Sequence, residues 1–230
     1  MTATPPDPNG IYSYSNGVVT PLAVTGSPAP GGGNLSFVNP SQRFGPVMND
    51  SGTTAFAAAL DTANESAVYV SANNTLVRIV GTGGIAPDGS TFVMVDSPSI
   101  NASGDIAFWG ITSSELGIFL SSNGVITKVV ASGDVIGQNM VGYIDYPLLS
   151  DTGHIAFFAM VNNGNSAIFL AQPRATNKNK AGLKKDELMV SSSTPLKADS
   201  ELVMELRDQY KRVIDAQRQR GREVLTPKAK

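Results

Sequence analysis

The stretch Asn101-Ala-Ser-Gly104-Asp-Ile-Ala-Phe108 decides the fold class, because it occurs three times along the chain. The other copies are Asn49-Asp-Ser-Gly52-Thr-Thr-Ala-Phe56 and Ser150-Asp-Thr-Gly153-His-Ile-Ala-Phe157. Self-similarity at a regular period of about 20–50 residues is the signature of repeat architectures. A proline stands three residues before each copy, so the segment that leads into the turn recurs together with the turn and the strand.

Two further motifs surround this stretch in a fixed order. A short strand motif occurs four times: Gly10-Ile-Tyr-Ser, Ala67-Val-Tyr-Val, Gly117-Ile-Phe-Leu and Ala167-Ile-Phe-Leu. A turn followed by β-branched residues occurs three times: Asn16-Gly-Val-Val, Asn74-Thr-Leu-Val and Asn123-Gly-Val-Ile. Asn-Gly between such residues is a strong hairpin signal, and Asn-x-x-Gly is typical of a tight turn. Each unit is therefore predicted to be four short strands joined by turns.

The predicted fold is all-β and β-propeller-like, with about three four-stranded blades and a C-terminal amphipathic α-helix. The run from Gly104 to Ile111 is apolar on both faces, as a strand is when sheets cover it on both sides. Repetition of the units in a fixed order favours blades over a β-sandwich.

The number of repeat units is too small for a closed ring. The chain offers two complete units and two partial ones, 10–24 and 147–172, and the N-terminal strands could pair with the C-terminal ones to complete a third blade. Propellers close with about four to eight blades. We therefore expect self-association, either as two chains in one ring or as an open stack capped by other proteins.

The pattern N-x-x-G-x-x-A-F, with its G-I-F-L strand and N-G-x-I-T-x-V-V hairpin, resembles the bacterial tandem-repeat proteins named for that motif. The resemblance covers roughly residues 10–172, and Ser150 is its one departure among the motif asparagines. It implies a propeller-like, non-enzymatic protein that is exported and attached to the cell surface by a variable C-terminal anchor. No catalytic residues come with it.

Charge divides the chain near residue 173. Up to Pro173 there are three basic residues against eleven acidic ones, and from Arg174 onward there are fourteen basic against eight acidic. Such a shift indicates two parts with different surroundings. The predicted organisation is a β-repeat domain over 1–173, a basic linker over 174–198 and a helical tail over 199–230.

The tail carries the predicted interaction site. Asp199 or Ser200 can cap a helix that ends near Gly221. Helical spacing places apolar side chains on one face, which we predict to contact a partner: Val203, Leu206, Tyr210, Val213 and Ile214. The favoured partner is another subunit or protein, and packing on the chain's own β body is the alternative. Binding to nucleic acid or anionic lipid is not expected, because acidic residues are interspersed with the basic ones.

Enzyme chemistry finds little support in the residue types. The chain has no cysteine and a single histidine, His154, at a repeat position that Thr53 and Asp105 occupy in the other copies. No catalytic residue and no resident cofactor is predicted. Calcium is the one ion considered, since carboxylates gather in turns: Asp50, Asp61, Asp88, Asp96, Asp105, Asp134, Asp145 and Asp151.

The leading functional hypothesis is a structural or interaction module that assembles with itself or with a larger complex through its tail. A carbohydrate- or calcium-dependent ligand-binding module is the alternative, and a carboxylate-based hydrolase comes third. Met1 to Pro8 lacks the basic-then-apolar order of a signal peptide, and no apolar run is long enough to span a membrane. An extracellular or cell-surface location is expected, with a virion or the cytoplasm as alternatives.

Overall fold

The computed structural model describes residues 9–37, 45–62, 65–162, 165–172 and 189–191. Within these ranges every regular element is a β-strand, so the predicted all-β class is confirmed for the described part of the chain. The predicted C-terminal helix, 199–230, lies outside these ranges. So does the predicted linker, 174–198, apart from one short strand at 189–191.

The strands form four antiparallel sheets in chain order, which we call sheets I to IV. Sheet I holds β1 (Gly10–Ser15) and β2 (Val18–Val24). Sheet II holds β3 (Leu35–Phe37), β4 (Val47–Met48), β5 (Thr54–Leu60), β6 (Ser66–Ala72) and β7 (Thr75–Gly81). Sheet III holds β8 (Phe92–Ile100), β9 (Ile106–Thr112), β10 (Leu116–Ser122) and β11 (Val125–Ala131). Sheet IV holds β12 (Val135–Ile136), β13 (Asn139–Leu149), β14 (Ile155–Val161), β15 (Asn165–Gln172) and β16 (Met189–Ser191).

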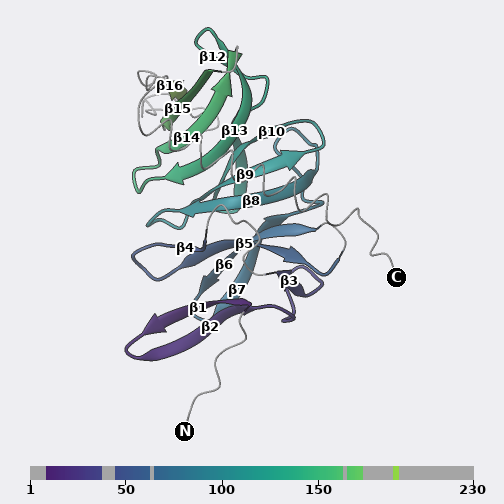
Figure 1. The fold of residues 1–230 in the computed structure, drawn as a ribbon, viewed down its shortest axis with the longest axis vertical. Helices are drawn as coiled ribbons and strands as arrows, with labels where there is room; N and C mark the ends of the chain where they lie inside the picture. Colours follow the sequence, from purple (N-terminus) through teal and green to yellow (C-terminus); the bar gives the residue numbers. More distant parts are fainter. Residues whose placement is uncertain (1–8, 38–44, 63–64, 163–164, 173–188, 192–230) are drawn as a thin grey trace, which may run out of the picture.

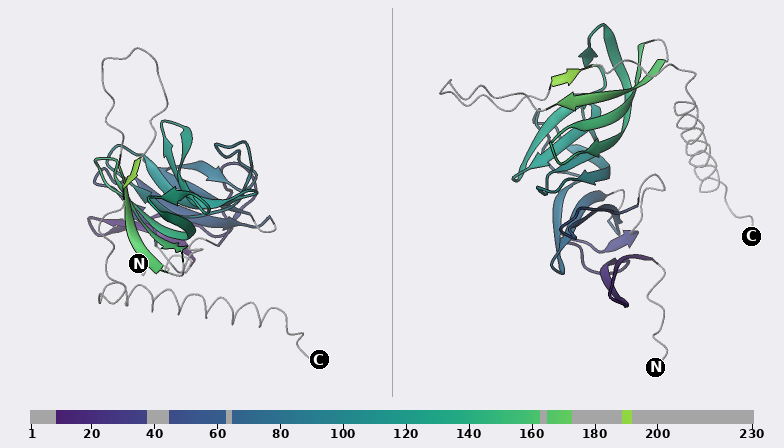
Figure 2. Two further views of the ribbon diagram at one scale, coloured as in Figure 1. Left: turned by 90° about the horizontal axis from the view of Figure 1, so that it is seen from above. Right: turned by 90° about the vertical axis from the view of Figure 1, so that its left-hand side faces the viewer.

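The four sheets follow one another along the long axis of the molecule, with sheet I at one end and sheet IV at the other (Figures 1 and 2). This arrangement corrects one prediction, because β1 and β2 pair only with each other while β15 pairs with β14 and β16. The N-terminal strands therefore do not complete the last sheet. They lie at the opposite end of the row, and among the described residues no further sheet follows sheet IV or precedes sheet I.

Tight turns join the strands where the motifs predicted them in sheets I and III, and one residue before the predicted Asn74-Thr75 position in sheet II. The turn residues of the three hairpins have positive φ: Asn16 (50°) and Gly17 (81°), Asn73 (49°) and Asn74 (60°), Asn123 (50°) and Gly124 (77°). Two successive positive φ angles define the type I′ turn, whose twist matches that of the flanking strands. Each hairpin also has a register shift at the same repeat position, for example between Ile118 and Phe119.

The three aromatic residues of the repeated motif occupy equivalent places. Phe56, Phe108 and Phe157 are all buried. Each stacks on the ring directly across the strand pair, with centroid distances of 5.8 Å to Tyr69, 5.7 Å to Phe119 and 5.8 Å to Phe169. Burying one such side chain stabilises a fold by about 1.5–3 kcal/mol. This equivalence confirms that the sequence repeats are structural repeats.

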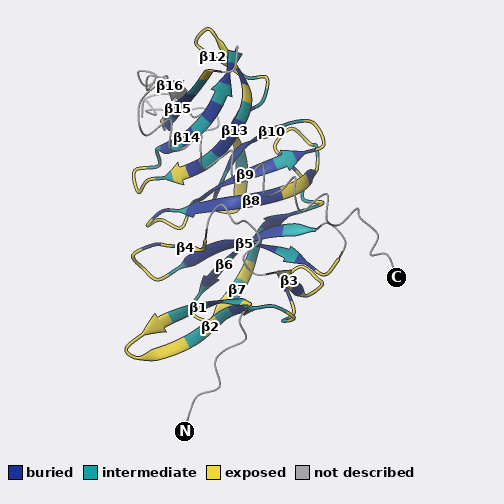
Figure 3. Cartoon of the chain, in the orientation of Figure 1, coloured by how far each residue is buried: buried dark blue, intermediate teal, exposed yellow. Residues whose placement is uncertain are grey.

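The hydrophobic core is divided into three parts, and each part lies between two consecutive sheets. Alternate residues of the central strands point to opposite sides, so Phe108 of β9 packs toward sheet II while Ala107 packs toward sheet IV. The same alternation places Phe56 of β5 against sheet I and Ala57 against sheet III. Sheets II and III are therefore covered on both faces, as the apolar runs predicted (Figure 3).

Candidate functional site

One motif asparagine, Asn49, connects two repeats. The side-chain oxygen of Asn49 accepts hydrogen bonds from the backbone N–H of Ser51 (3.2 Å) and of Thr53 (3.0 Å), which closes its own turn. The Nδ2 of the same side chain donates to the carbonyl oxygen of Asn101, 2.9 Å away in the next repeat, and this bond is buried. The motif asparagine therefore has a structural role that links two sheets.

Sheets III and IV are linked by hydrogen bonds from backbone donors. The backbone N–H of Ala102 donates to Asp151 at 2.7 Å, and the backbone N–H of Leu149 donates to the hydroxyl of Ser99 at 2.9 Å. Ser150 replaces the third motif asparagine, and its hydroxyl accepts from the backbone N–H of His154 at 3.1 Å. Serine thus closes the turn, although it lacks the amide nitrogen that could reach a following repeat.

Buried aspartates mark a second repeated feature, at the bend in β8 and β13. Asp96 and Asp145 are each followed by a non-glycine residue with positive φ, Ser97 at 50° and Tyr146 at 62°. Asp145 is fully buried, accepts from the phenol of Tyr143 at 2.6 Å, and accepts from the backbone N–H of Tyr146 at 3.0 Å. These carboxylates support a strained backbone, which stores about 1–3 kcal/mol at such positions.

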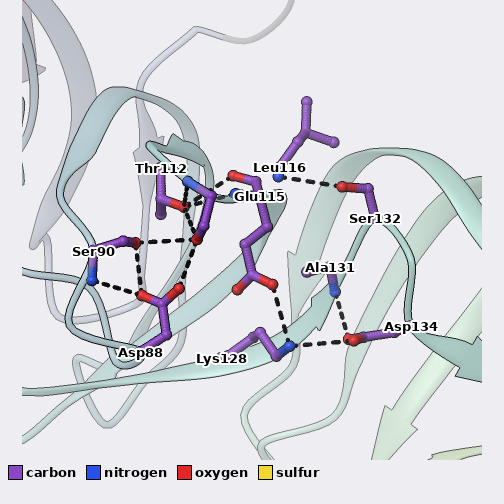
Figure 4. A network of polar contacts seen from close by, with 10 residues as sticks. Asp88, Ser90, Thr112, Glu115, Leu116, Lys128, Ala131, Ser132 and Asp134 are labelled. Carbon is purple, nitrogen blue, oxygen red and sulfur yellow. Dashed lines mark hydrogen bonds and ion pairs between the residues drawn. The ribbon is translucent and has the colours of Figure 1, made fainter.

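An exposed polar network lies beside the β8–β11 sheet (Figure 4). Asp88 accepts from the hydroxyls of Ser114 and Ser90, both at 2.6 Å, and from the backbone N–H of Ser90 at 3.0 Å. These bonds favour the charged carboxylate and lower the pKa of Asp88 to about 2, with the Ser114 bond as the largest cause. The network ties the loop before β8 to the turn between β9 and β10.

The same loop-to-turn connection occurs in all three complete sheets. A backbone N–H at or just before the start of β3, β8 or β13 donates to a side chain that follows β5, β9 or β14: Asn34 to Asp61 (2.8 Å), Thr91 to Ser113 (3.4 Å), Met140 to Asn162 (3.0 Å). The bond from Asn34 is also the main reason why the pKa of Asp61 is lowered. Turn carboxylates that sequence reasoning considered for calcium thus hold neighbouring loops together.

Lys128 supplies the one cation of this network in Figure 4. Its Nζ lies 3.3 Å from Glu115 and 3.2 Å from Asp134, which also accepts from the backbone N–H of Ala131. Burial alone would lower the pKa of Lys128, but the bond and charge of Asp134, together with Glu115, outweigh it and raise the pKa. The arrangement joins β11 to the loop that leads into sheet IV.

In the described part of the chain, the contacts of His154 do not have the geometry of a catalytic triad. Its Nδ1 lies 2.7 Å from the hydroxyl of Thr152, and a hydroxyl does not orient and charge-stabilise an imidazole as a carboxylate does in a triad. In the described ranges, no group of three histidine, cysteine, aspartate or glutamate side chains could hold a metal ion. Nor does any helix there have the length and apolar character needed to cross a membrane.

Trp109 belongs to the core. It is 7 % exposed, and its Nε1 donates to the carbonyl oxygen of Ile144, 2.9 Å away in sheet IV. A tryptophan used in this way fixes the distance between two sheets. It is therefore not a stacking platform for a sugar.

The outer faces of the two end sheets, sheet I and sheet IV, are more exposed than the equivalent faces of sheet III. We call the side that faces the preceding sheet the backward face, and the side that faces the following sheet the forward face. On the backward face of sheet I, Tyr14 is 75 % exposed and its cross-strand neighbour Val19 is 51 % exposed. The equivalent backward-face pair in sheet III is Ser121 and Ile126, where Ser121 is buried and Ile126 packs into a core.

The forward face of sheet IV shows the same contrast. Ala156 and Phe158 of β14 are partly exposed, whereas the equivalent Ala107 and Trp109 of β9 are buried. Sequence reasoning missed both end faces. A signal was present, however, because residues 10–24 and 155–172 contain no charged residue, whereas the equivalent stretches of sheet III carry Lys128 and Glu115. The predicted tail face, Val203, Leu206, Tyr210, Val213 and Ile214, lies outside the described residues.

Comparison with known protein families adds one finding. A family of unknown function, DUF7453, matches residues 1–187, which span β1 to β15 and thus the four-sheet body apart from β16. The chain belongs to this family. No curated protein and no solved structure matches the chain. Membership of DUF7453 assigns no activity, and the predicted tail helix falls after the matched range.

Proposed function

We propose that this DUF7453 member is a non-enzymatic structural or interaction module, a propeller-like row of repeats that assembles with itself or with a larger complex through its helical tail. Following the resemblance to the N-x-x-G-x-x-A-F repeat proteins, we place it outside the cell or on its surface. The observation that carries the proposal is how the repeated motif residues are used. They cap turns, link sheets and fill cores, as Asn49, Trp109 and Phe108 do.

Two features support the proposal: the end faces of the row and the predicted tail helix. A row of sheets with covered middle faces, an exposed Tyr14–Val19 pair at one end and partly exposed Ala156 and Phe158 at the other resembles an assembly unit, because exposed apolar surface marks interaction sites. An isolated amphipathic helix of about 20 residues is only marginally stable in water, so the predicted tail helix needs a surface to pack on.

The test is the mass of the full chain in solution, measured by light scattering during size-exclusion chromatography. We expect a species heavier than the 24.0 kDa of one chain. Leu206→Asp, on the predicted apolar face of the tail, should reduce that mass, whereas the matched change Gln219→Asp lies on the opposite face of a helix and should leave it unchanged.

Two results would count against the proposal. A full chain that stays at 24.0 kDa at every concentration, with no protein captured from its source, would remove the assembly role. Equal masses for Leu206→Asp and Gln219→Asp chains would remove the tail from that role.

A further inference from the structure

Each interface inside the molecule pairs the backward face of one sheet with the forward face of the sheet before it, and the two end sheets each have one face outside these pairings. The backward faces of sheets II, III and IV each carry a stacked aromatic pair, such as Phe108 with Phe119, and each of these faces packs on the preceding sheet. The forward face of sheet II carries smaller aliphatic side chains, such as Ala57 and Val68. Between sheets II and III, large rings therefore pack against small aliphatic groups, which is how cores reach their high packing density.

The two ends of the row carry one half of such an interface each. Sheet I has a backward face with the exposed pair Tyr14 and Val19 and no sheet before it among the described residues. Sheet IV has a forward face with Ala156, Phe158 and Leu170, where Ala156 and Leu170 are cross-strand partners. One end of the row thus presents Tyr14 and Val19, and the other presents Ala156, Phe158 and Leu170.

Charge points to the same pairing. Neither residues 10–24 nor residues 155–172 carry a charge, although 16% of the whole chain is charged. Surfaces exposed to water in a soluble protein normally carry charges, and uncharged strand surfaces are sites of association. The long axis separates the two end faces, so a chain cannot bring its own ends together without changing the row (Figure 1).

We propose that the backward face of sheet I binds the forward face of sheet IV of a second copy of this chain, in a head-to-tail contact that continues the internal row of sheets. Because the two faces differ, the contact is heterologous. Such contacts close into a ring when the rotation from copy to copy allows it, and otherwise extend as a filament. The inference rests on the proposed assembly function and names the surfaces and the partner.

The decisive experiment mixes two full-length variants that are blocked at opposite ends. Tyr14→Glu blocks the face of sheet I, and Phe158→Glu blocks the face of sheet IV. Each variant alone should lose the head-to-tail contact and have a lower mass than the wild type, whereas an equimolar mixture should gain mass by pairing one variant with the other, because each variant retains the face that the other lacks. Light scattering measures the masses, and circular dichroism checks that each variant is folded.

Control variants separate this contact from a general effect of added negative charge. Val125→Glu changes a 57 % exposed valine at the start of β11, away from both end faces, and should associate as the wild type does. Val19→Glu and Met160→Glu repeat the two blocks at neighbouring positions, so that a misfolded single variant does not decide the result.

Several outcomes would overturn the inference. If both blocked variants associate as the wild type does while Leu206→Asp does not, assembly goes through the tail and the proposed function survives without this contact. If each blocked variant is monomeric and the mixture is monomeric too, the contact is not head-to-tail. A wild-type chain that stays monomeric, with a lowered Tm in the Phe158→Glu variant alone, would mean that the chain's own tail covers sheet IV.

Discussion

Asn49 shows how one side chain performs two structural tasks. Its oxygen closes a turn through bonds to residues two and four positions later, and its nitrogen bonds the equivalent residue of the next repeat. An amide side chain carries its acceptor and its donors on two separate atoms, so it can reach both partners at once. An aspartate would supply the first function alone, and the same holds for the serine at position 150.

Asn49→Ser should retain the turn and remove the inter-repeat bond. The carbonyl oxygen of Asn101 would then be buried without this donor, so the free energy of unfolding should fall by about 1–3 kcal/mol. Chemical denaturation monitored by circular dichroism measures the change. Asn165→Ser, at an exposed position of β15, is the matched control, and equal stabilities for the two variants would contradict a structural role for the bond.

Asp88 should make stability depend on pH at the acid end. Its pKa is lowered from 3.8 to about 2 in the folded chain, so its contribution is complete above pH 3.8 and disappears as the pH falls through about 2. Asp88→Asn should have a lower Tm than the wild type at neutral pH, and the difference should shrink toward pH 2. Thermal melts across that range measure it, and Ser114→Ala should reproduce part of the effect, while a pH-independent difference would contradict it.

Among the elements, the hairpins depend on turn residues that tolerate positive φ. Asn123 and Gly124 form the turn between β10 and β11, and nothing lies within 4 Å of a Cβ placed on Gly124. A substitution there is therefore disfavoured by backbone conformation and not by crowding. The register shift after Ile118 leaves Val129 as an extra residue in β11, and the consecutive residues Val129 and Val130 both pack into the core between sheets III and IV.

Gly124→Ala should lower the free energy of unfolding by roughly 1 kcal/mol, because alanine is strained at a φ of 77°. Gly45→Ala is the control, since Gly45 also has open space around its Cβ and is not among the residues with positive φ. Denaturant unfolding of the two variants gives the comparison. Equal values would show that the turn conformation does not limit stability.

The stability of each sheet in the row should increase with the number of its faces that neighbouring sheets cover. Sheets II and III are packed on both sides, whereas the described part of sheet I is a two-stranded hairpin with one covered face. In stacked architectures each unit depends mainly on its neighbours. The middle of the row is therefore expected to open last.

Hydrogen exchange measured by mass spectrometry should reveal this gradient. Amides of β9 should exchange most slowly and those of β1 and β2 fastest, because strands at an end of the row open without disrupting the other cores. A higher protein concentration should slow the hydrogen exchange of the β1 and β2 amides if the head-to-tail contact forms. Uniform exchange along the row would mean that the body unfolds as a single unit and would contradict this prediction.

Much of the architecture could be predicted from the sequence, because the signals are local. The turns depend on hydrogen bonds between residues two to four positions apart and on φ angles that asparagine and glycine tolerate. The alternation along β5, β9 and β14 shows which residues face a core, and the period shows that the cores repeat. The repeat pattern by itself therefore predicts equivalent environments for Phe56, Phe108 and Phe157.

Tertiary structure alone decided how the ends of the row are used. The motif of β1 is equivalent to those of β6, β10 and β15, so the sequence was equally compatible with an N-terminal hairpin that completes sheet IV and with one that forms its own sheet. Local hydrogen bonds cannot distinguish the two, because both satisfy the same turn and the same alternation. The choice depends on where distant sheets lie, and the row places β1 and β2 against sheet II, far from sheet IV.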